Sequence, residues 1–135
     1  MTPEYILDTN IVSYLLKGQI PVLRTRFERI PVEAIAISSI TEAEVFYGLA
    51  RKPGALRLQF AAEAFFASVT RLAWDSTAAR AYGTMRAEQE RKGRPLTVED
   101  LMIAAHALSL GLTLVTHDQA FSYVDGLRAE DWTVA

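Results

Sequence analysis

Short, predominantly apolar runs alternate along this chain with longer segments of helical periodicity, and this alternation constrains the fold more than any other feature. The clearest apolar runs cover residues 5–7, 34–37 and 112–115. A strand whose successive residues are all apolar is buried on both faces, as in a parallel sheet covered by helices. The pattern therefore predicts an α/β fold with a central parallel sheet.

Helix caps and breakers divide the segments between these runs. Gly18 and Gly111 each follow residues at helical spacing, where glycine commonly ends a helix. Asp75 or Ser76, and Thr97, are of the residue types that begin one. We expect helices ending at Gly18, over 20–30, about 41–51, about 55–68, from 75 or 76 to 93 and 97–110, a weak strand near 70–73 and an edge strand over 132–134.

Composition limits the class of protein. The 135 residues, 50% of them hydrophobic, are enough for one domain with a real core and too few for two. A net charge of -2 gives no long-range attraction to a polyanion, so nucleic acid must meet a local basic patch. The chain has no cysteine, no signal-peptide pattern and no membrane-length apolar stretch. We therefore expect a cytoplasmic protein that makes no membrane contact.

Four acidic residues occupy equivalent places in this pattern. Asp8 follows the first apolar run directly, and Asp118 comes three residues after the run that ends at Val115. Glu44 and Asp100 lie in the first turns of expected helices. Because strand ends and the following helix starts share one edge of a parallel sheet, all four side chains could face one cleft.

Each acid taken alone also fits a helix cap, including a capping box from Thr41 to Glu44 and a cap of a short last helix by Asp118. Capping does not explain why four acids follow different strands at one edge. Carboxylates about 5 Å apart repel by roughly 3 kcal/mol at an effective dielectric of about 20, so such a cluster holds protons or a hard cation. Oxygen ligands favour Mg²⁺ or Mn²⁺, which can drive hydrolysis of phosphodiesters without a side-chain nucleophile.

The two histidines form no convincing catalytic pair. His106 follows Asp100 by six residues on the same helix, about 120° away from its face, which favours a buried position. His117 adjoins Asp118, and it fits either an exposed loop or a contact with substrate.

Four motifs around the acids resemble those of the PIN-domain ribonucleases and, within them, the VapC toxins of toxin–antitoxin pairs. The first motif is Ile6-Leu7-Asp8-Thr9-Asn10, and the second runs from Ser38 to Gly48 and places its glutamate at Glu44 rather than Glu42. The third runs from Asp100 to Ala107 and leaves Glu99 outside, and the fourth is Leu114-Val115-Thr116-His117-Asp118 with Phe121 after it. The resemblance spans nearly the whole chain.

The resemblance implies a three-layer sandwich with a parallel sheet in the order 3-2-1-4-5, and Mg²⁺- or Mn²⁺-dependent cleavage of RNA by water. Transfer RNA is a frequent target in the family. It also implies a homodimer and a small VapB-like antitoxin that wraps the toxin. Within this frame Asp8 and Asp100 are the main expected metal ligands, Glu44 and Asp118 complete the site, and Asn10 and Thr116 support it by hydrogen bonds or serve as local caps.

An acidic cleft repels RNA, so basic residues must supply affinity for the backbone. We favour Arg91, Lys92 and Arg94 because three charges crowd the short loop that leads to Asp100. Solvated helix faces account for many of the other basic residues, which include Lys17, Arg24, Arg26, Arg29, Arg51, Lys52, Arg57 and Arg86.

The expected helix over residues 55–69 has two apolar stripes, although a surface helix needs only one. Leu58, Phe65 and Val69 form the first stripe, and Leu56, Phe60 and Ala67 form the second on nearly the opposite side. The second stripe fits a partner helix, a dimer mate, or burial between two layers of this chain's own core.

Two other classes of protein remain to be weighed. A receiver-like Mg²⁺-binding phosphoacceptor domain has a similar size, but it needs an acidic pair after the first strand and a lysine after a late strand, and this chain has only Lys17, Lys52 and Lys92. A binding module with an inactive site is the other alternative, and it predicts no binding of Mn²⁺.

Overall fold

The computed structural model describes residues 2–94 and 96–135, and it contains one five-stranded sheet with the strand order β3-β2-β1-β4-β5. Every neighbouring pair of strands is parallel. In chain order the elements are β1 (Tyr5–Leu7), α1 (Thr9–Lys17), α2 (Pro21–Arg29), η1 (Val32–Ala34), β2 (Ile35–Ser38), α3 (Ser39–Ala50), α4 (Leu56–Ser68), β3 (Thr70–Leu72), α5 (Ser76–Arg91), α6 (Val98–Leu110), β4 (Thr113–Val115), η2 (Gln119–Tyr123) and β5 (Ala129–Glu130). The predicted α/β fold and the strand order 3-2-1-4-5 are confirmed.

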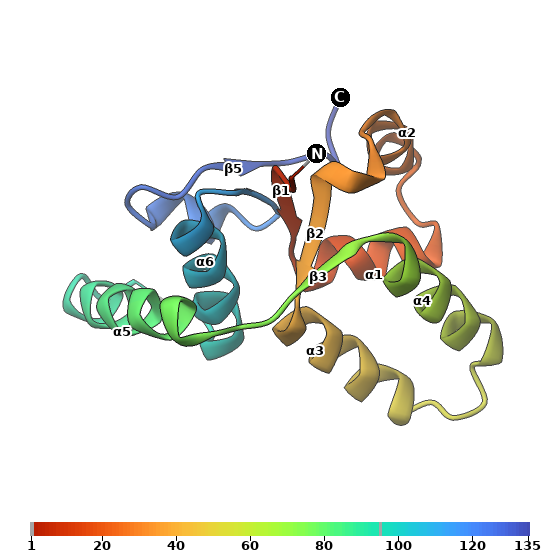
Figure 1. Cartoon of the computed structure of the whole chain (residues 1–135), viewed down its shortest axis with the longest axis horizontal. Helices are drawn as coiled ribbons and strands as arrows, with labels where there is room; N and C mark the ends of the chain where they lie inside the picture. Colours follow the sequence, from red (N-terminus) through yellow and green to blue (C-terminus); the bar gives the residue numbers. More distant parts are fainter. Residues whose placement is uncertain (1, 95) are drawn as a thin grey trace.

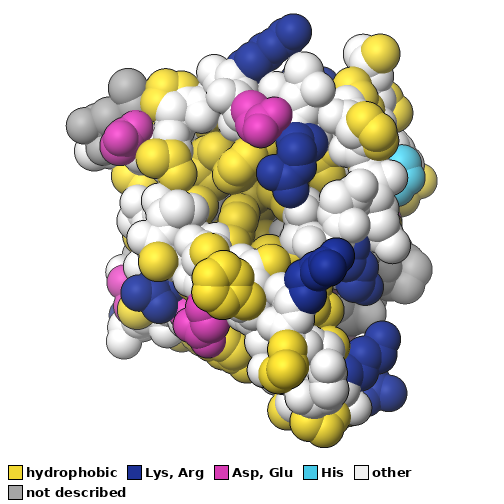
Figure 2. Space-filling view, turned by 90° about the vertical axis from the view of Figure 1, so that its right-hand side faces the viewer, with side chains coloured by type: hydrophobic (Ala, Val, Ile, Leu, Met, Phe, Trp, Pro, Cys, Tyr) yellow, Lys and Arg dark blue, Asp and Glu magenta, His cyan; other side chains and the backbone are white. Residues whose placement is uncertain are grey.

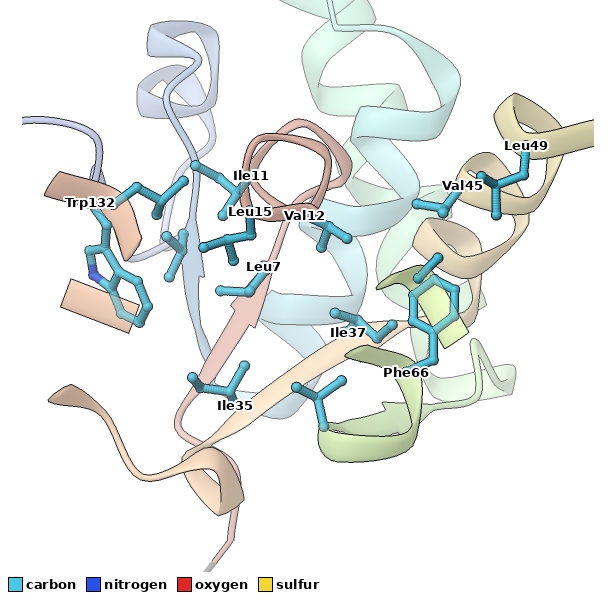
Figure 3. Close-up of a cluster of buried hydrophobic side chains, with 14 residues drawn as sticks. Leu7, Ile11, Val12, Leu15, Ile35, Ile37, Val45, Leu49, Phe66 and Trp132 are labelled. Atoms are coloured by element: carbon cyan, nitrogen blue, oxygen red, sulfur yellow. The ribbon is translucent and has the colours of Figure 1, made fainter. Parts of the chain in front are cut away.

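Helices cover both faces of the sheet, with α1, α2 and α4 on one side and α5 and α6 on the other (Figure 1). Successive residues of β1 point to opposite faces. Leu7 packs into a cluster with Leu15, Ile37 and Phe66 (Figure 3), and Ile6 packs into a second cluster with Ile103 of α6. This double burial explains why β1 is apolar at every position rather than at every second one.

The expected helix ends at glycine are confirmed. Gly18 and Gly111 adopt φ of 64° and 67°, the left-handed region that glycine enters without a steric cost, and each closes the helix before it. The start of α3 differs from the expectation by two residues. Ser38 is the N-cap, and its hydroxyl accepts a hydrogen bond from the Ile40 N–H, so Thr41 lies inside the helix.

The expected edge strand over residues 132–134 is wrong, because β5 is Ala129–Glu130. Trp132 is instead a core residue, 1% exposed, with its ring 5.0 Å from that of Tyr5 in an edge-to-face arrangement. A tryptophan next to β-branched residues favours a strand locally, but here the burial of one large ring decides the backbone path.

The two stripes of α4 have different environments. Leu58 and Phe65 pack against the core and Val69 is buried, whereas Leu56 and Phe60 are 70% and 79% exposed. Burial of the second stripe within this chain's own core is therefore excluded. In the described part of the chain, no helix has the length and apolar character needed to span a bilayer.

The strand order also excludes a receiver-like domain, whose sheet runs 2-1-3-4-5. In this chain β1 lies between β2 and β4. The carboxyl ends of these three strands share the edge at which α1 and α3 begin (Figure 1).

Candidate active site

Asp8 lies at the carboxyl end of β1, where it caps α1. It is 4% exposed, and its Oδ1 accepts a hydrogen bond of 2.9 Å from the Ile11 N–H. Burial raises the pKa of Asp8 from 3.8 to about 6, and the charges of Asp100 and Asp118 act in the same direction, against hydrogen bonds from Thr116 and Ile11. Burial therefore disfavours the charged form of Asp8, even though this side chain also caps α1.

Glu44 lies in the second turn of α3, half-buried, and is held from α1. The Thr9 hydroxyl lies 2.5 Å from Glu44 Oε1 and 3.2 Å from the Thr41 hydroxyl. Burial raises the pKa of Glu44, and the charges of Asp100 and Glu99 add to this effect against the hydrogen bond from Thr9. Since Ser38 caps α3, the capping-box explanation for Glu44 is wrong.

Asp100 lies in the first turn of α6, where its backbone N–H donates to the hydroxyl of the N-cap residue Thr97. Burial raises the pKa of Asp100, together with the charges of Asp118 and Glu99. The charge of Asp100 in turn raises the pKa of both Asp8 and Glu44. Asp100 is thus the member of the group that is linked to the other three acids: its charge acts on Asp8 and Glu44, and the charge of Asp118 acts on it.

Asp118 follows β4 and is exposed. Its Oδ1 accepts from the Ala120 N–H, so it caps η2 as one of the sequence interpretations proposed. Its own backbone N–H donates to the hydroxyl of Thr116, a residue that also hydrogen-bonds to Asp8. Thr116 therefore connects the first and the last of the four acids.

The four carboxylates fit a hard divalent cation by the chemistry of their donors. Each raised pKa means that the anion lacks compensation, which an ion such as Mg²⁺ supplies. Within residues 2–94 and 96–135, however, no three Asp, Glu or His side chains are already arranged as a metal site. The acids are near enough to influence one another electrostatically, and they would have to close around an ion.

A cleft of about 420 Å³ opens beside two of the acids. Its lining consists of Asp8, Asn10, Tyr14, His117, Asp118 and Gln119. Asn10, two residues after Asp8 in the chain, is exposed and lines this cleft. The cleft lies within the range of about 300–1,000 Å³ that is typical of ligand sites.

The histidines have different environments. His106 is 2% exposed, as the sequence indicates, and its Nδ1 lies 2.9 Å from the Ser38 hydroxyl. His117 is exposed, and its Nδ1 lies 2.9 Å from Asp131 Oδ2. Burial raises the pKa of Asp131, but hydrogen bonds from Thr133 and His117 outweigh it and hold the pKa below the usual value.

The three favoured basic residues lie around the C-terminal end of α5, outside the cleft lining. Arg91 pairs with Glu88, and Lys92 pairs with both Glu88 and Asp125. Arg94 stacks over the ring of Tyr123 at 4.9 Å. Their contact with RNA stays a prediction.

A different basic group adjoins the acids. Lys17, Arg51 and Lys52 line a groove of about 330 Å³ together with Glu44. The groove lies between α1, α3 and α4, and its floor contains Leu16, Val45, Leu49 and Leu58. This places positive charge immediately beside one of the four carboxylates.

Sequence reasoning missed three side chains that contact the site residues or influence their pKa values. Thr9 could have been found, because it follows Asp8 in the first motif and begins α1. Glu99 influences Glu44 and Asp100 although it lies outside the motif that contains Asp100. Asp131 carries no sequence signal, because only the fold brings the end of the chain back to His117.

Comparisons with known proteins agree with this architecture. Residues 5–127 match the family model described as PIN domain. The chain is 38% identical over 131 residues to the tRNA(fMet)-specific endonuclease VapC of Shigella flexneri, covering 96% of this chain and 98% of that protein. It is 35% identical over 130 residues to Ribonuclease VapC2 of Haemophilus influenzae, with coverage of 96% and 98%.

Solved structures give the same result. The crystal structure of DNA-bound VapBC from Salmonella typhimurium matches with a TM-score of 0.90 at 37% identity, over 98% of this chain and 99% of that chain. VapBC2 from Rickettsia felis, bound to a DNA fragment from its promoter, matches with a TM-score of 0.88 at 31% identity, over 95% and 98%. This chain therefore belongs to the PIN-domain family and, within it, to the VapC proteins.

Proposed function

We propose that this protein is a divalent-cation-dependent endoribonuclease and the toxin of a toxin–antitoxin pair, acting in the cytoplasm. The observation that carries the proposal is the position of Asp100, whose charge raises the pKa of both Asp8 and Glu44 and which is itself influenced by Asp118. Four carboxylates from four separate segments share one electrostatic environment at the carboxyl edge of the sheet. The VapC relatives, which are named as ribonucleases, support the same activity.

Asp8 and Asp100 are the residues proposed to hold Mg²⁺ or Mn²⁺, with Glu44 and Asp118 completing the site. When bound, such a cation supplies Lewis-acid activation of water and neutralises charge that develops on the phosphate. The protein's own part is positioning. The α1 backbone fixes Asp8, the Thr9 hydroxyl holds Glu44, and the Thr116 hydroxyl joins Asp8 to the Asp118 turn.

Asn10 and Thr116 are proposed as supports. Thr116 is 4% exposed and its hydroxyl already bonds on both sides, to Asp8 and to the Asp118 N–H. Asn10 faces the cleft beside Asp8 and offers an amide to a phosphate or a ribose.

The proposed substrate is RNA, with transfer RNA as the first class to test because one relative is named as a tRNA(fMet)-specific endonuclease. Backbone affinity requires positive charge near the acids. Lys17, Arg51 and Lys52 supply it in the groove that reaches Glu44. Arg91, Lys92 and Arg94 are the alternative group and would extend the contact over the end of α5.

A VapB-like antitoxin is the proposed partner, and the solved VapBC complexes support it. The exposed stripe of α4 gives this chain a surface for such a partner. Leu56 and Phe60 line a groove of about 530 Å³ with Phe46 and Leu49 of α3, and apolar side chains gather on the α4 side of the molecule (Figure 2). A homodimer is also expected, and it would need apolar surface of the same kind.

Cleavage of a transfer RNA pool tests the activity. We expect the wild-type protein to cut it with Mg²⁺ or Mn²⁺, to stop in EDTA, and to lose cleavage in Asp8→Asn and Asp100→Asn. Glu42→Gln is the matched control, because Glu42 forms an ion pair with Arg71 and its charge does not shift the pKa of Asp8, Glu44 or Asp100. Retained cleavage in both Asn variants would refute the site. The toxin assignment predicts growth arrest when the chain is produced without a partner, and normal growth would contradict that assignment alone.

A further inference from the structure

The cleft beside Asp8 is lined by two segments, each of which contributes one ring and one amide. Tyr14 and Asn10 come from α1, and His117 and Gln119 come from the segment after β4. Rings that offer their faces to bases, together with amides that can bond to base edges, are the equipment of sites for unstacked nucleotides. The acidic site accounts for neither of the two rings.

The ring of His117 is held by Asp131, and the turn around Asp131 does not depend on this contact. Asp131 Oδ1 already accepts from the Thr133 N–H at 2.8 Å and from the Thr133 hydroxyl at 2.5 Å. The additional contact between Asp131 Oδ2 and His117 Nδ1 leaves the backbone turn as it is and fixes the imidazole. Since a carboxylate only accepts, Nδ1 carries the proton in this contact.

Asp131 is in turn held by a residue from the N-terminal part of the chain. Arg26 of α2 donates to the backbone oxygen of Asp131, and its guanidinium lies 6.0 Å from the ring centre of the buried Trp132. The His117 ring is therefore exposed, but its orientation is fixed by the contact with Asp131. A ring that is already oriented loses less conformational entropy when it binds a ligand.

Tyr14 is held in a different way. Its ring packs partly against the hydrophobic cluster that contains Leu15 and Trp132, while the residue also lines the cleft. Its hydroxyl makes no hydrogen bond to any of the described residues. The core holds one part of the ring in place and leaves another part at the cleft.

We infer that Tyr14 and His117 form a subsite for one unpaired nucleotide of the RNA, with the base against the two rings and its phosphate toward Asp8 and Asp118. This inference rests on the proposed ribonuclease function and names the form of its substrate, a single-stranded segment. A base inside a duplex is already stacked on its neighbours and cannot reach both rings.

Affinity for a short single-stranded oligoribonucleotide tests the subsite directly. The protein carries Asp100→Asn to prevent cleavage, and fluorescence anisotropy measures Kd for the single strand and for the same sequence in a duplex. We expect Tyr14→Leu and His117→Ala each to weaken single-strand binding by about 5- to 100-fold, the loss typical of one stacked base. Tyr14→Phe keeps the ring and is expected to bind as before.

Phe60→Leu is the control, because Phe60 is an exposed aromatic residue of α4 that does not line the cleft. Asp131→Asn should weaken binding less than His117→Ala does, and it should add nothing in the His117→Ala background, since it acts through the imidazole. Should Tyr14→Leu fail to fold, the exposed His117 still carries the test.

The results separate the subsite from the function. Unchanged affinity in Tyr14→Leu and His117→Ala, with a wild-type protein that cleaves RNA, overturns the subsite alone. Tighter binding of the duplex than of the single strand also overturns it. A wild-type protein that neither binds the single strand nor cleaves RNA overturns the proposed function and the subsite together.

Discussion

The hydroxyl of Thr9 donates a hydrogen bond of 2.5 Å to Oε1 of Glu44, and so links the first turn of α1 to the second turn of α3. Thr41 lies 3.2 Å from the same hydroxyl and is fully buried. Because Thr9 has one hydroxyl proton, Thr41 is the donor to Thr9 and Thr9 is the donor to Glu44. The carboxylate is thus held by a chain of two hydroxyl groups whose bonds reinforce each other.

Thr9→Val removes this donor and keeps the shape of the side chain. A hydrogen bond to a charged group contributes about 1.5–3 kcal/mol, so we expect kcat to fall by roughly 10- to 100-fold. Thr9→Ser restores the hydroxyl and should recover most of the rate. Steady-state cleavage of RNA measures both variants, and wild-type kcat in Thr9→Val would show that Glu44 needs no such support.

Asp8→Asn should stabilise the protein at neutral pH in the absence of divalent cations. Asn keeps an oxygen acceptor for the Ile11 N–H, so the cap of α1 survives while the buried charge is lost. The pKa of Asp8 is raised from 3.8 to about 6, which corresponds to roughly 3 kcal/mol by linkage.

The sign of this effect follows from the raised pKa. The folded protein binds the Asp8 proton more tightly than the unfolded chain does, so the stabilisation is complete below about pH 4 and is lost as the pH rises through about 6. Urea unfolding in EDTA should show the advantage of Asp8→Asn over wild type growing across this range. An advantage that does not change with pH would contradict the prediction. Asp8→Ala, which also loses the cap, should be about 1 kcal/mol less stable than Asp8→Asn.

Phe60 and Phe66 both lie on α4, and substitutions at these two positions should distinguish an effect on partner binding from an effect on stability. Phe60 is 79% exposed and Phe66 is 1% exposed. We expect Phe60→Ser to change the free energy of unfolding by less than about 0.5 kcal/mol and to weaken copurification with the antitoxin, whereas Phe66→Ala should cost about 3–5 kcal/mol. Unchanged copurification of Phe60→Ser would place the antitoxin on another surface.

The salt dependence of RNA binding distinguishes the two basic groups. Lys52→Gln and Lys17→Gln should each reduce the slope of log K against log salt by about 0.7, the value for one contact with a single-strand phosphate. Arg91→Gln should change the slope less, since Arg91 already pairs with Glu88. The opposite order would place the RNA backbone over the end of α5, as the sequence predicted.

The fold was predictable because its determinants are local. Apolar runs and the capping residues Gly18, Asp75, Thr97 and Gly111 mark most of the elements within a few residues of their bounds. The strand over residues 132–134 was mispredicted because the position of Trp132 depends on a core that only tertiary packing creates.

Some parts of the candidate site were likewise predictable from the sequence, and others were not. Asp8 and Asp118 follow strands, and Asp100 begins a helix, so topology alone placed them at one edge. The support of His117 by Asp131 joins residues 14 positions apart through the last strand, and no periodicity reports that contact. The raised pKa values likewise depend on burial and on neighbouring charges, which a sequence does not contain.

Calorimetric titration of Mn²⁺ into the metal-free protein tests the central claim most directly. The wild-type protein and Glu42→Gln should bind the ion with equal affinity, and Asp100→Asn should weaken binding by at least about tenfold, as expected when one ligand is removed. Absence of binding by the wild-type protein would favour a binding module with an inactive site. Equal affinity in Asp100→Asn would contradict a cation held jointly by these carboxylates.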